Sequence, residues 1–158
     1  MFQKGKTFQV RPLTFFIKEN KYVMEENYSF VDTSKILFSL LRFSDITNYR
    51  QDLSKENEFL QVNARKFEKG TFIKPHKHLK RDSNISLTQE CWIIFKGIVC
   101  AEIYDIDDNF YKKVTLKAGD CIVFFNGGHS LKVEEDDSIM YEIKNGPYLG
   151  IEKDKTSI

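Results

Sequence analysis

The chain has 158 residues, of which 41% are hydrophobic and 30% are charged, so it can build one folded domain under a charged surface. Lys and Arg number 24 against 23 Asp and Glu, a formal net charge of +1, which lacks the basic surplus typical of dedicated nucleic-acid binders. No apolar run approaches the roughly 20 residues of a membrane-spanning helix. We therefore expect neither a nucleic-acid partner nor membrane insertion.

The N-terminal residues and the cysteines indicate the same compartment. The apolar residues at 15–17 are followed at once by charged ones, so we do not expect them to form the core of a signal peptide. Cys91, Cys100 and Cys121 form no CxxC pair and lie among apolar residues, which predicts buried free thiols in strands. An odd number of cysteines without a signal peptide favours the reducing cytoplasm.

The first sixty residues have mixed periodicity. The apolar residues between 36 and 43 predict either a buried strand or a short helix, because the pattern fits both. Residues 47–58 are polar and indicate a connection. We therefore divide the chain into an N-terminal extension at 1–59 and a main domain at 60–158.

Beyond residue 60, short apolar segments recur at close spacing with turn residues between them, which predicts an all-β sandwich or barrel. The expected strands cover 71–73, 91–95, 98–105, 111–116, 121–125, 129–134 and 138–144. Asp107-Asp108-Asn109 is typical of a hairpin turn. Short strands joined by tight turns favour a β-barrel or jelly roll.

Two of these strands are apolar on both faces. Residues 92–95 and 121–125 contain no polar side chain, so the outer face of the sheet needs a cover as well. Either the N-terminal sixty residues or a second subunit supplies that cover, and we expect a homodimer.

The three histidines indicate a metal site. His76 and His78 are two residues apart, so on a strand their rings point to the same side. His129 shares its face with Leu131 and Val133 and is expected to point inward. Three neutral imidazoles that converge on one interior point can bind a metal ion.

Glu90 is the fourth candidate ligand. It shares a strand face with Trp92 and Ile94, so its carboxylate is expected in the core, where it is costly unless paired or bound to a metal. Three imidazoles and one carboxylate suit a divalent transition metal: Fe, Mn, Ni, Zn or Cu. The alternatives are a solvated basic loop around His76 and His78, and an ion pair of Glu90 with a lysine.

The spacing of these residues resembles the motifs of the cupin superfamily. The first motif is glycine, five residues, His-x-His, a gap, Glu, six residues and glycine, which this chain matches from Gly70 to Gly97. The gap from His78 to Glu90 holds eleven residues and is longer than usual. The second motif is glycine, five residues, Pro-x-Gly, two residues and His. This chain resembles it from Gly119 to Asn126-Gly127-Gly128-His129, but it is one residue short and has Phe125 in place of the proline.

The resemblance covers residues from about 60 to 145, and the Asn-Gly-Gly-His turn with the tail at 141–148 looks like a subgroup of small bacterial cupins. It implies a double-stranded β-helix, the jelly-roll barrel of the superfamily, with the N-terminal extension packing on or across it. It also implies the metal ligands His76, His78, Glu90 and His129, with Gln89 as a reserve ligand. Gln89, Trp92, Tyr104 and Tyr141 are the candidates for lining the cavity.

The resemblance implies a metal-binding protein that acts on a small molecule, with oxygenase, isomerase and decarboxylase chemistry all open. The metal would serve as a Lewis acid or an oxygen-binding centre. Lys74, Lys77, Lys80 and Arg81 surround the histidine motif and favour an anionic or carbohydrate-type ligand, and residues 79–88 are expected to gate its entry. The alternatives are a metal-free sugar-nucleotide isomerase or epimerase, and a non-catalytic ligand-binding module.

Overall fold

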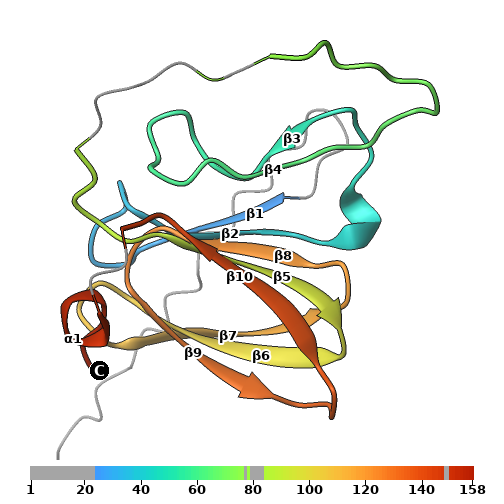
Figure 1. Cartoon of the computed structure of the whole chain (residues 1–158). Helices are drawn as coiled ribbons and strands as arrows, with labels where there is room; N and C mark the ends of the chain where they lie inside the picture. The colour runs from blue at the N-terminus through green and yellow to red at the C-terminus, as the bar shows by residue number, and fades with distance from the viewer. Residues whose placement is uncertain (1–23, 77, 79–83, 148–149) are drawn as a thin grey trace, which may run out of the picture.

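The computed structural model of the chain describes residues 24–76, 78, 84–147 and 150–158 (Figure 1). These residues form three antiparallel sheets, none of which closes on itself, with one short helix and one 3-10 turn. The expected all-β class is therefore confirmed. Within the described residues no helix has the length and apolar character needed to cross a membrane.

A five-stranded sheet holds most of the core. Its order is β1 (Met24–Tyr28), β2 (Ile36–Leu41), β8 (Cys121–Phe124), β5 (Glu90–Lys96) and β10 (Ile139–Lys144). The three-stranded sheet has the order β7 (Phe110–Lys117), β6 (Ile98–Tyr104) and β9 (Gly128–Val133). The small elements are β3 (Gln51–Asp52), β4 (Asn63–Ala64), the 3-10 turn η1 (Phe43–Asp45) and α1 (Ile151–Asp154).

The predicted strands between residues 91 and 144 are all present, to within two residues at most ends. The segment from 36 to 43 is mainly strand β2. The strand expected at 71–73 is wrong, because this segment has irregular backbone and pairs with no other strand. Phe72 and Ile73 there are 77% and 52% exposed, so no core holds the segment in place.

The five-stranded and three-stranded sheets pack face to face (Figure 1). Strand register places Leu40, Ile122 and Trp92 in one row across the inner face of the large sheet. The facing sheet contributes Val99 and Ala101 to the same core. Alternating side chains thus give each sheet an apolar inner face, as a β-sandwich requires.

A second apolar cluster lies on the opposite, outer face of the large sheet. Cys91, Val123 and Phe125 are buried there, beneath Leu53 and the partly buried side chains of residues 46–64. Ile46 and Leu53 belong to the N-terminal extension, and residues 60–64 belong to the start of the main domain. The cover that the outer face of these apolar strands needs is therefore supplied here from within the chain.

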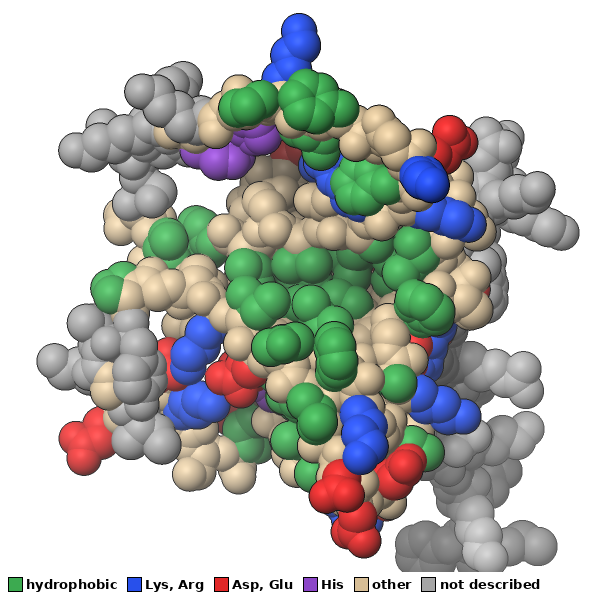
Figure 2. All heavy atoms as spheres, turned by 45° about the vertical axis from the view of Figure 1, so that its right-hand side comes forward, with side chains coloured by type: hydrophobic (Ala, Val, Ile, Leu, Met, Phe, Trp, Pro, Cys, Tyr) green, Lys and Arg blue, Asp and Glu red, His purple; other side chains and the backbone are tan. Residues whose placement is uncertain are grey.

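The outer face is uncovered, among the described residues, at the β5–β10 end. Phe95 and Tyr141 are 67% and 59% exposed, and their rings lie 5.8 Å apart. Figure 2 shows hydrophobic side chains gathered across the middle of one face of the molecule, above a cluster of acidic side chains. The homodimer stays a prediction.

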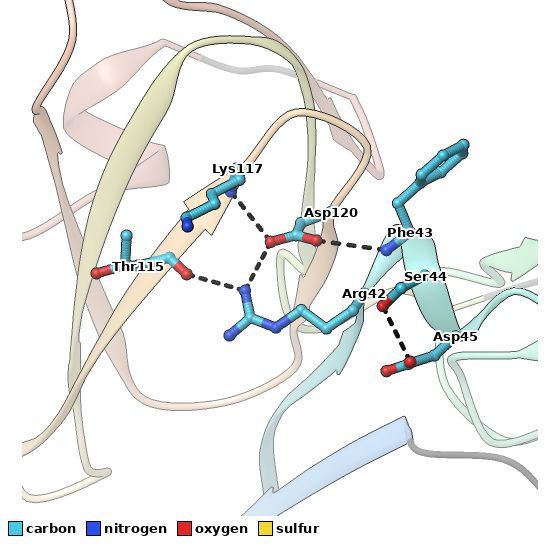
Figure 3. Close-up of polar contacts among 7 residues, drawn as sticks. All are labelled: Arg42, Phe43, Ser44, Asp45, Thr115, Lys117 and Asp120. Carbon is cyan, nitrogen blue, oxygen red and sulfur yellow. Dashed lines mark hydrogen bonds and ion pairs between the residues drawn. The ribbon is translucent and has the colours of Figure 1, made fainter.

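A buried carboxylate ties the two sheets together at one end (Figure 3). Asp120, in the turn between β7 and β8, accepts a hydrogen bond from Arg42 Nη1 at 2.6 Å and one from the Lys117 backbone N–H at 3.0 Å. Arg42 also donates to the carbonyl oxygen of Thr115 on β7, at 2.9 Å. Arg42 directly follows β2 of the large sheet, and its guanidinium is thereby bonded both to the β7–β8 turn and to β7 of the small sheet.

Replacement of Asp120 by alanine should lower the free energy of unfolding by about 2–3 kcal/mol, because it leaves a partly buried guanidinium and two backbone N–H groups without their acceptor. Urea denaturation measures this change. The matched control is Asp52→Ala, which breaks the Arg50–Asp52 pair, whose side chains are each 50% exposed. The control should cost less than about 1 kcal/mol. An equal decrease in the free energy of unfolding in the two variants would show that Asp120 does not hold the two sheets together.

Candidate functional site

Glu90 is the first residue of β5 and lies on the inner face of the large sheet. Register places it between Phe124 of β8 and Lys144 of β10. The residue is only 5% exposed. The expected inward orientation of this carboxylate is confirmed, and its charge needs partners because burial without them is costly.

Two side chains supply those partners at the same oxygen. Trp92 Nε1 donates a hydrogen bond to Glu90 Oε1 at 2.5 Å, from two residues along the same strand face. His129 Nε2 lies 3.3 Å from Glu90 Oε1. The imidazole comes from β9 in the facing sheet, where it pairs with the buried Ile103. Glu90 and His129 therefore meet across the gap between the two sheets.

Aromatic rings hold the imidazole in position. The His129 ring stacks on Phe124 with centroids 4.1 Å apart and an interplanar angle of 16°. Trp92 meets His129 edge-on at 5.1 Å and Phe124 edge-on at 4.7 Å. The His129 side chain is 23% exposed, so a ligand or a proton can still reach the ring. We call Glu90 and His129 the inner pair, and Trp92 and Phe124 are its two aromatic neighbours.

The electrostatics of the inner pair favour an ionised carboxylate. Burial alone raises the pKa of Glu90, but the hydrogen bonds from His129 and Trp92 more than offset this and leave the pKa below its ordinary value. An ionised carboxylate beside an imidazole can ligate a metal ion or orient the histidine as a base.

A second polar group adjoins Glu90 on β10. Lys144 Nζ lies 2.7 Å from Asp154 Oδ2 in α1, and this hydrogen bond raises the pKa of Lys144. Thr88 Oγ1 donates to the same carboxylate at 3.4 Å. A hollow of about 270 Å³ at this end of β5 is lined by Ile85, Ser86, Leu87, Thr88, Asn145, Gly146, Pro147 and Asp154.

The other two predicted ligands lie on an irregular, exposed segment. The rings of His76 and His78 stand 5.5 Å apart, and His76 Nδ1 lies 2.9 Å from the carbonyl oxygen of Lys74. A donor at Nδ1 leaves Nε2 with the lone pair that a metal needs. The structure brings these two rings to each other but not to the inner pair. Among its described residues no three His, Cys, Asp or Glu side chains gather as a metal site.

Of the four candidate cavity residues, Trp92 alone contacts the inner pair in the described contacts. Gln89 turns the other way, donating to Glu58 Oε2 at 2.6 Å and accepting from the Leu60 backbone N–H at 2.8 Å. Tyr141 lies beside Phe95 on the outer face, and Tyr104 lies beside Phe110 on β7. Lys77, Lys80, Arg81 and the 79–83 part of the expected gate lie outside the described residues.

Two residues of the site were missed by the sequence analysis. Phe124 supplies the stacking surface for His129, although its sequence signal was only that of one more apolar residue in a strand. Lys144 lies in the expected strand at 138–144, and nothing in the sequence indicates that its side of the strand is the inner one. Both positions depend on strand pairing between distant segments, which sequence alternation does not specify.

We compared the chain with protein-family models, curated proteins and solved structures, and nothing matches. The site is therefore defined by its own geometry: an ionised carboxylate and an imidazole 3.3 Å apart, packed against two aromatic rings.

Removal of the imidazole by His129→Ala should raise the pKa of Glu90 above its value in the unmodified protein. Burial then acts with one hydrogen-bond donor fewer to oppose it. Carboxyl ¹³C chemical shifts followed through a pH titration report this pKa directly. His76→Ala is the matched control and should leave the Glu90 titration in place. An unchanged Glu90 pKa in His129→Ala would show that the imidazole does not stabilise the carboxylate.

The stability of the protein should depend on pH through Glu90. Because folding lowers this pKa, the ionised carboxylate contributes stability above its ordinary pKa, and the contribution is lost as the pH falls through the lowered value. The glutamine side chain of Glu90→Gln does not titrate in this pH range. The stability of the unmodified protein relative to Glu90→Gln should therefore decline as the pH drops from 7 to 3, measured by urea denaturation. A constant difference over that range would contradict the lowered pKa.

Proposed function

We propose that the chain is a cupin-type jelly-roll protein that binds one divalent transition metal ion together with a small polar molecule. The observation that carries this proposal is the inner pair, in which a 5%-exposed carboxylate is kept ionised beside a partly exposed imidazole. Buried charges of this kind persist where they are paired or ligate a metal.

The donor set suits such an ion. A carboxylate oxygen and imidazole nitrogens are ligands for Fe, Mn, Ni, Zn and Cu alike. Glu90 and His129 are the two donors already in contact, and His76 and His78 are two further imidazoles already side by side. Trp92, which donates to Glu90, orients that carboxylate from outside the ligand set. A bound ion would supply a Lewis acid or an oxygen-binding centre.

The small-molecule part of the proposal rests on the hollow at the start of β5. Its rim carries the Thr88 hydroxyl, the Asn145 amide and the Asp154 carboxylate, all of them hydrogen-bonding groups. Its volume of about 270 Å³ lies just below the usual range of ligand sites and suits a small molecule. Hydroxyl-rich, carbohydrate-type molecules match this rim best.

A second candidate function follows from the same contact. A histidine 3.3 Å from an ionised carboxylate is the arrangement of an oriented general base, and no third donor joins the pair among the described residues. This observation favours metal-free acid–base chemistry, as in a sugar-nucleotide isomerase or epimerase. Retention of sugar-nucleotide binding after complete chelation would favour this candidate over the metal site.

Calorimetric titration of the full chain with Zn²⁺ and with Mn²⁺ tests the metal site. We expect one ion per chain, with the affinity falling at least ~10–100-fold in Glu90→Gln, in His129→Ala and in a His76→Ala/His78→Ala double variant, because each removes ligands. Glu102→Gln, on β6 and paired with Lys113, is the control and should bind as the unmodified chain does.

Three results would contradict the four-ligand site. One is the absence of binding by the unmodified chain. A second is binding that depends on His76 and His78 but not on the inner pair. The third is binding that survives the double variant at full affinity, which would leave the inner pair as a two-residue site.

A further inference from the structure

Two thiols lie in contact on the outer face of the large sheet, on the opposite side from the inner pair. Cys91 of β5 and Cys121 of β8 have their Sγ atoms 3.5 Å apart, within hydrogen-bond range for sulfur. Cys91 is fully buried and Cys121 is partly exposed. The third cysteine, Cys100 on β6, has its Sγ 3.9 Å from the carbonyl oxygen of Ala101 and is buried.

Strand register explains why the two thiols meet. Cys91 pairs with Val123 and Cys121 pairs with Ile93, so the cysteines are diagonal neighbours on antiparallel strands and share one face. Diagonal Cα atoms lie roughly 7–8 Å apart in such pairs, slightly beyond the 4.4–6.8 Å usual for disulfides. The sulfurs must approach by about 1.5 Å to bond, so closing the disulfide requires the backbones of β5 and β8 to move closer together.

The chemistry of the contact favours oxidation. The two sulfurs are already neighbours, so a sulfenic acid formed on one cysteine has the other thiol 3.5 Å away to attack it. A thiolate is the reactive form in disulfide chemistry. Partial exposure of Cys121 gives small oxidants a route to the pair.

We propose that Cys91 and Cys121 are an oxidation site, at which a peroxide converts the two thiols into an intramolecular disulfide while Cys100 stays reduced. The thiolate of one cysteine attacks a peroxide oxygen, the O–O bond breaks, and a sulfenic acid and hydroxide form. The second thiol then attacks the sulfenic sulfur, the S–O bond breaks, and water leaves. The two thiols lose two electrons, and hydrogen peroxide is reduced to two molecules of water.

This disulfide should be reversible by ordinary thiols. Its diagonal placement strains the bond, and strained disulfides are reduced more readily than relaxed ones. The bond would join β5 to β8 on the sheet face opposite Glu90 and Phe124. Glu90 directly precedes Cys91 in β5, and Phe124 lies three residues after Cys121 in β8. The two thiols lie on the face opposite the inner pair, and their test uses no added metal, so its outcome is distinguishable from that of the proposed function.

The test is thiol counting on the full chain before and after mild hydrogen peroxide treatment, with alkylation under denaturing conditions and peptide mass mapping. We expect alkylatable thiols to fall from three to one, a loss of two hydrogens in mass, and one peptide pair linked through Cys91 and Cys121. Dithiothreitol should restore all three thiols. Linkage through Cys100, linkage between chains, or oxygen adducts in place of the disulfide would each overturn the proposal.

Matched variants complete the test. Cys100→Ala should still lose two thiols on oxidation, whereas Cys121→Ala and Cys91→Ala should lose none to an intramolecular disulfide. Formation of an intramolecular disulfide at unchanged yield in Cys121→Ala would overturn the assignment. If the buried Cys91→Ala variant does not fold, the peptide map of the unmodified chain and the Cys121→Ala variant decide the question.

Discussion

The burial of one carboxylate between two sheets is the constraint on which the candidate site depends. Glu90 can remain charged at 5% exposure only because the indole of Trp92 and the imidazole of His129 reach the same oxygen. The first partner comes from its own strand and the second from the facing sheet. The contact therefore requires the sandwich to be assembled, and it fixes how the small sheet sits against the large one at this end.

A second buried carboxylate, that of Asp120, holds the opposite end of the sandwich together. Asp120 accepts from Arg42 and from two backbone N–H groups, and its turn also pairs with β5 at Ile94. Ile94 lies four residues along β5 from Glu90, a distance of roughly 13 Å in a strand. Two buried carboxylates thus anchor the sheets at their two ends, with the apolar core between them. Asp120 is saturated by its partners, whereas the histidine partner of Glu90 remains partly open to solvent.

Local alternation predicted much of this structure. A period of two is a property of each strand alone, so the strands from 91 to 144 and the inward direction of Glu90 were predictable. The strand expected at 71–73 is absent because a segment this short forms a strand only when another strand pairs with it. Tyr141 shows a second limit: alternation separates two faces of β10, but the apolar face is the exposed one, and the face with Glu142 and Lys144 is the inner one.

Anomalous diffraction from crystals of the full chain grown with Zn²⁺ would locate a metal ion bound at the inner pair. We expect one anomalous peak within ~2.0–2.2 Å of both a Glu90 carboxylate oxygen and His129 Nε2, with imidazole nitrogens of His76 and His78 completing the coordination. A peak bound by His76 and His78 alone, far from Glu90, would contradict it. So would a Glu90–His129 contact that stays unchanged and metal-free at saturating Zn²⁺.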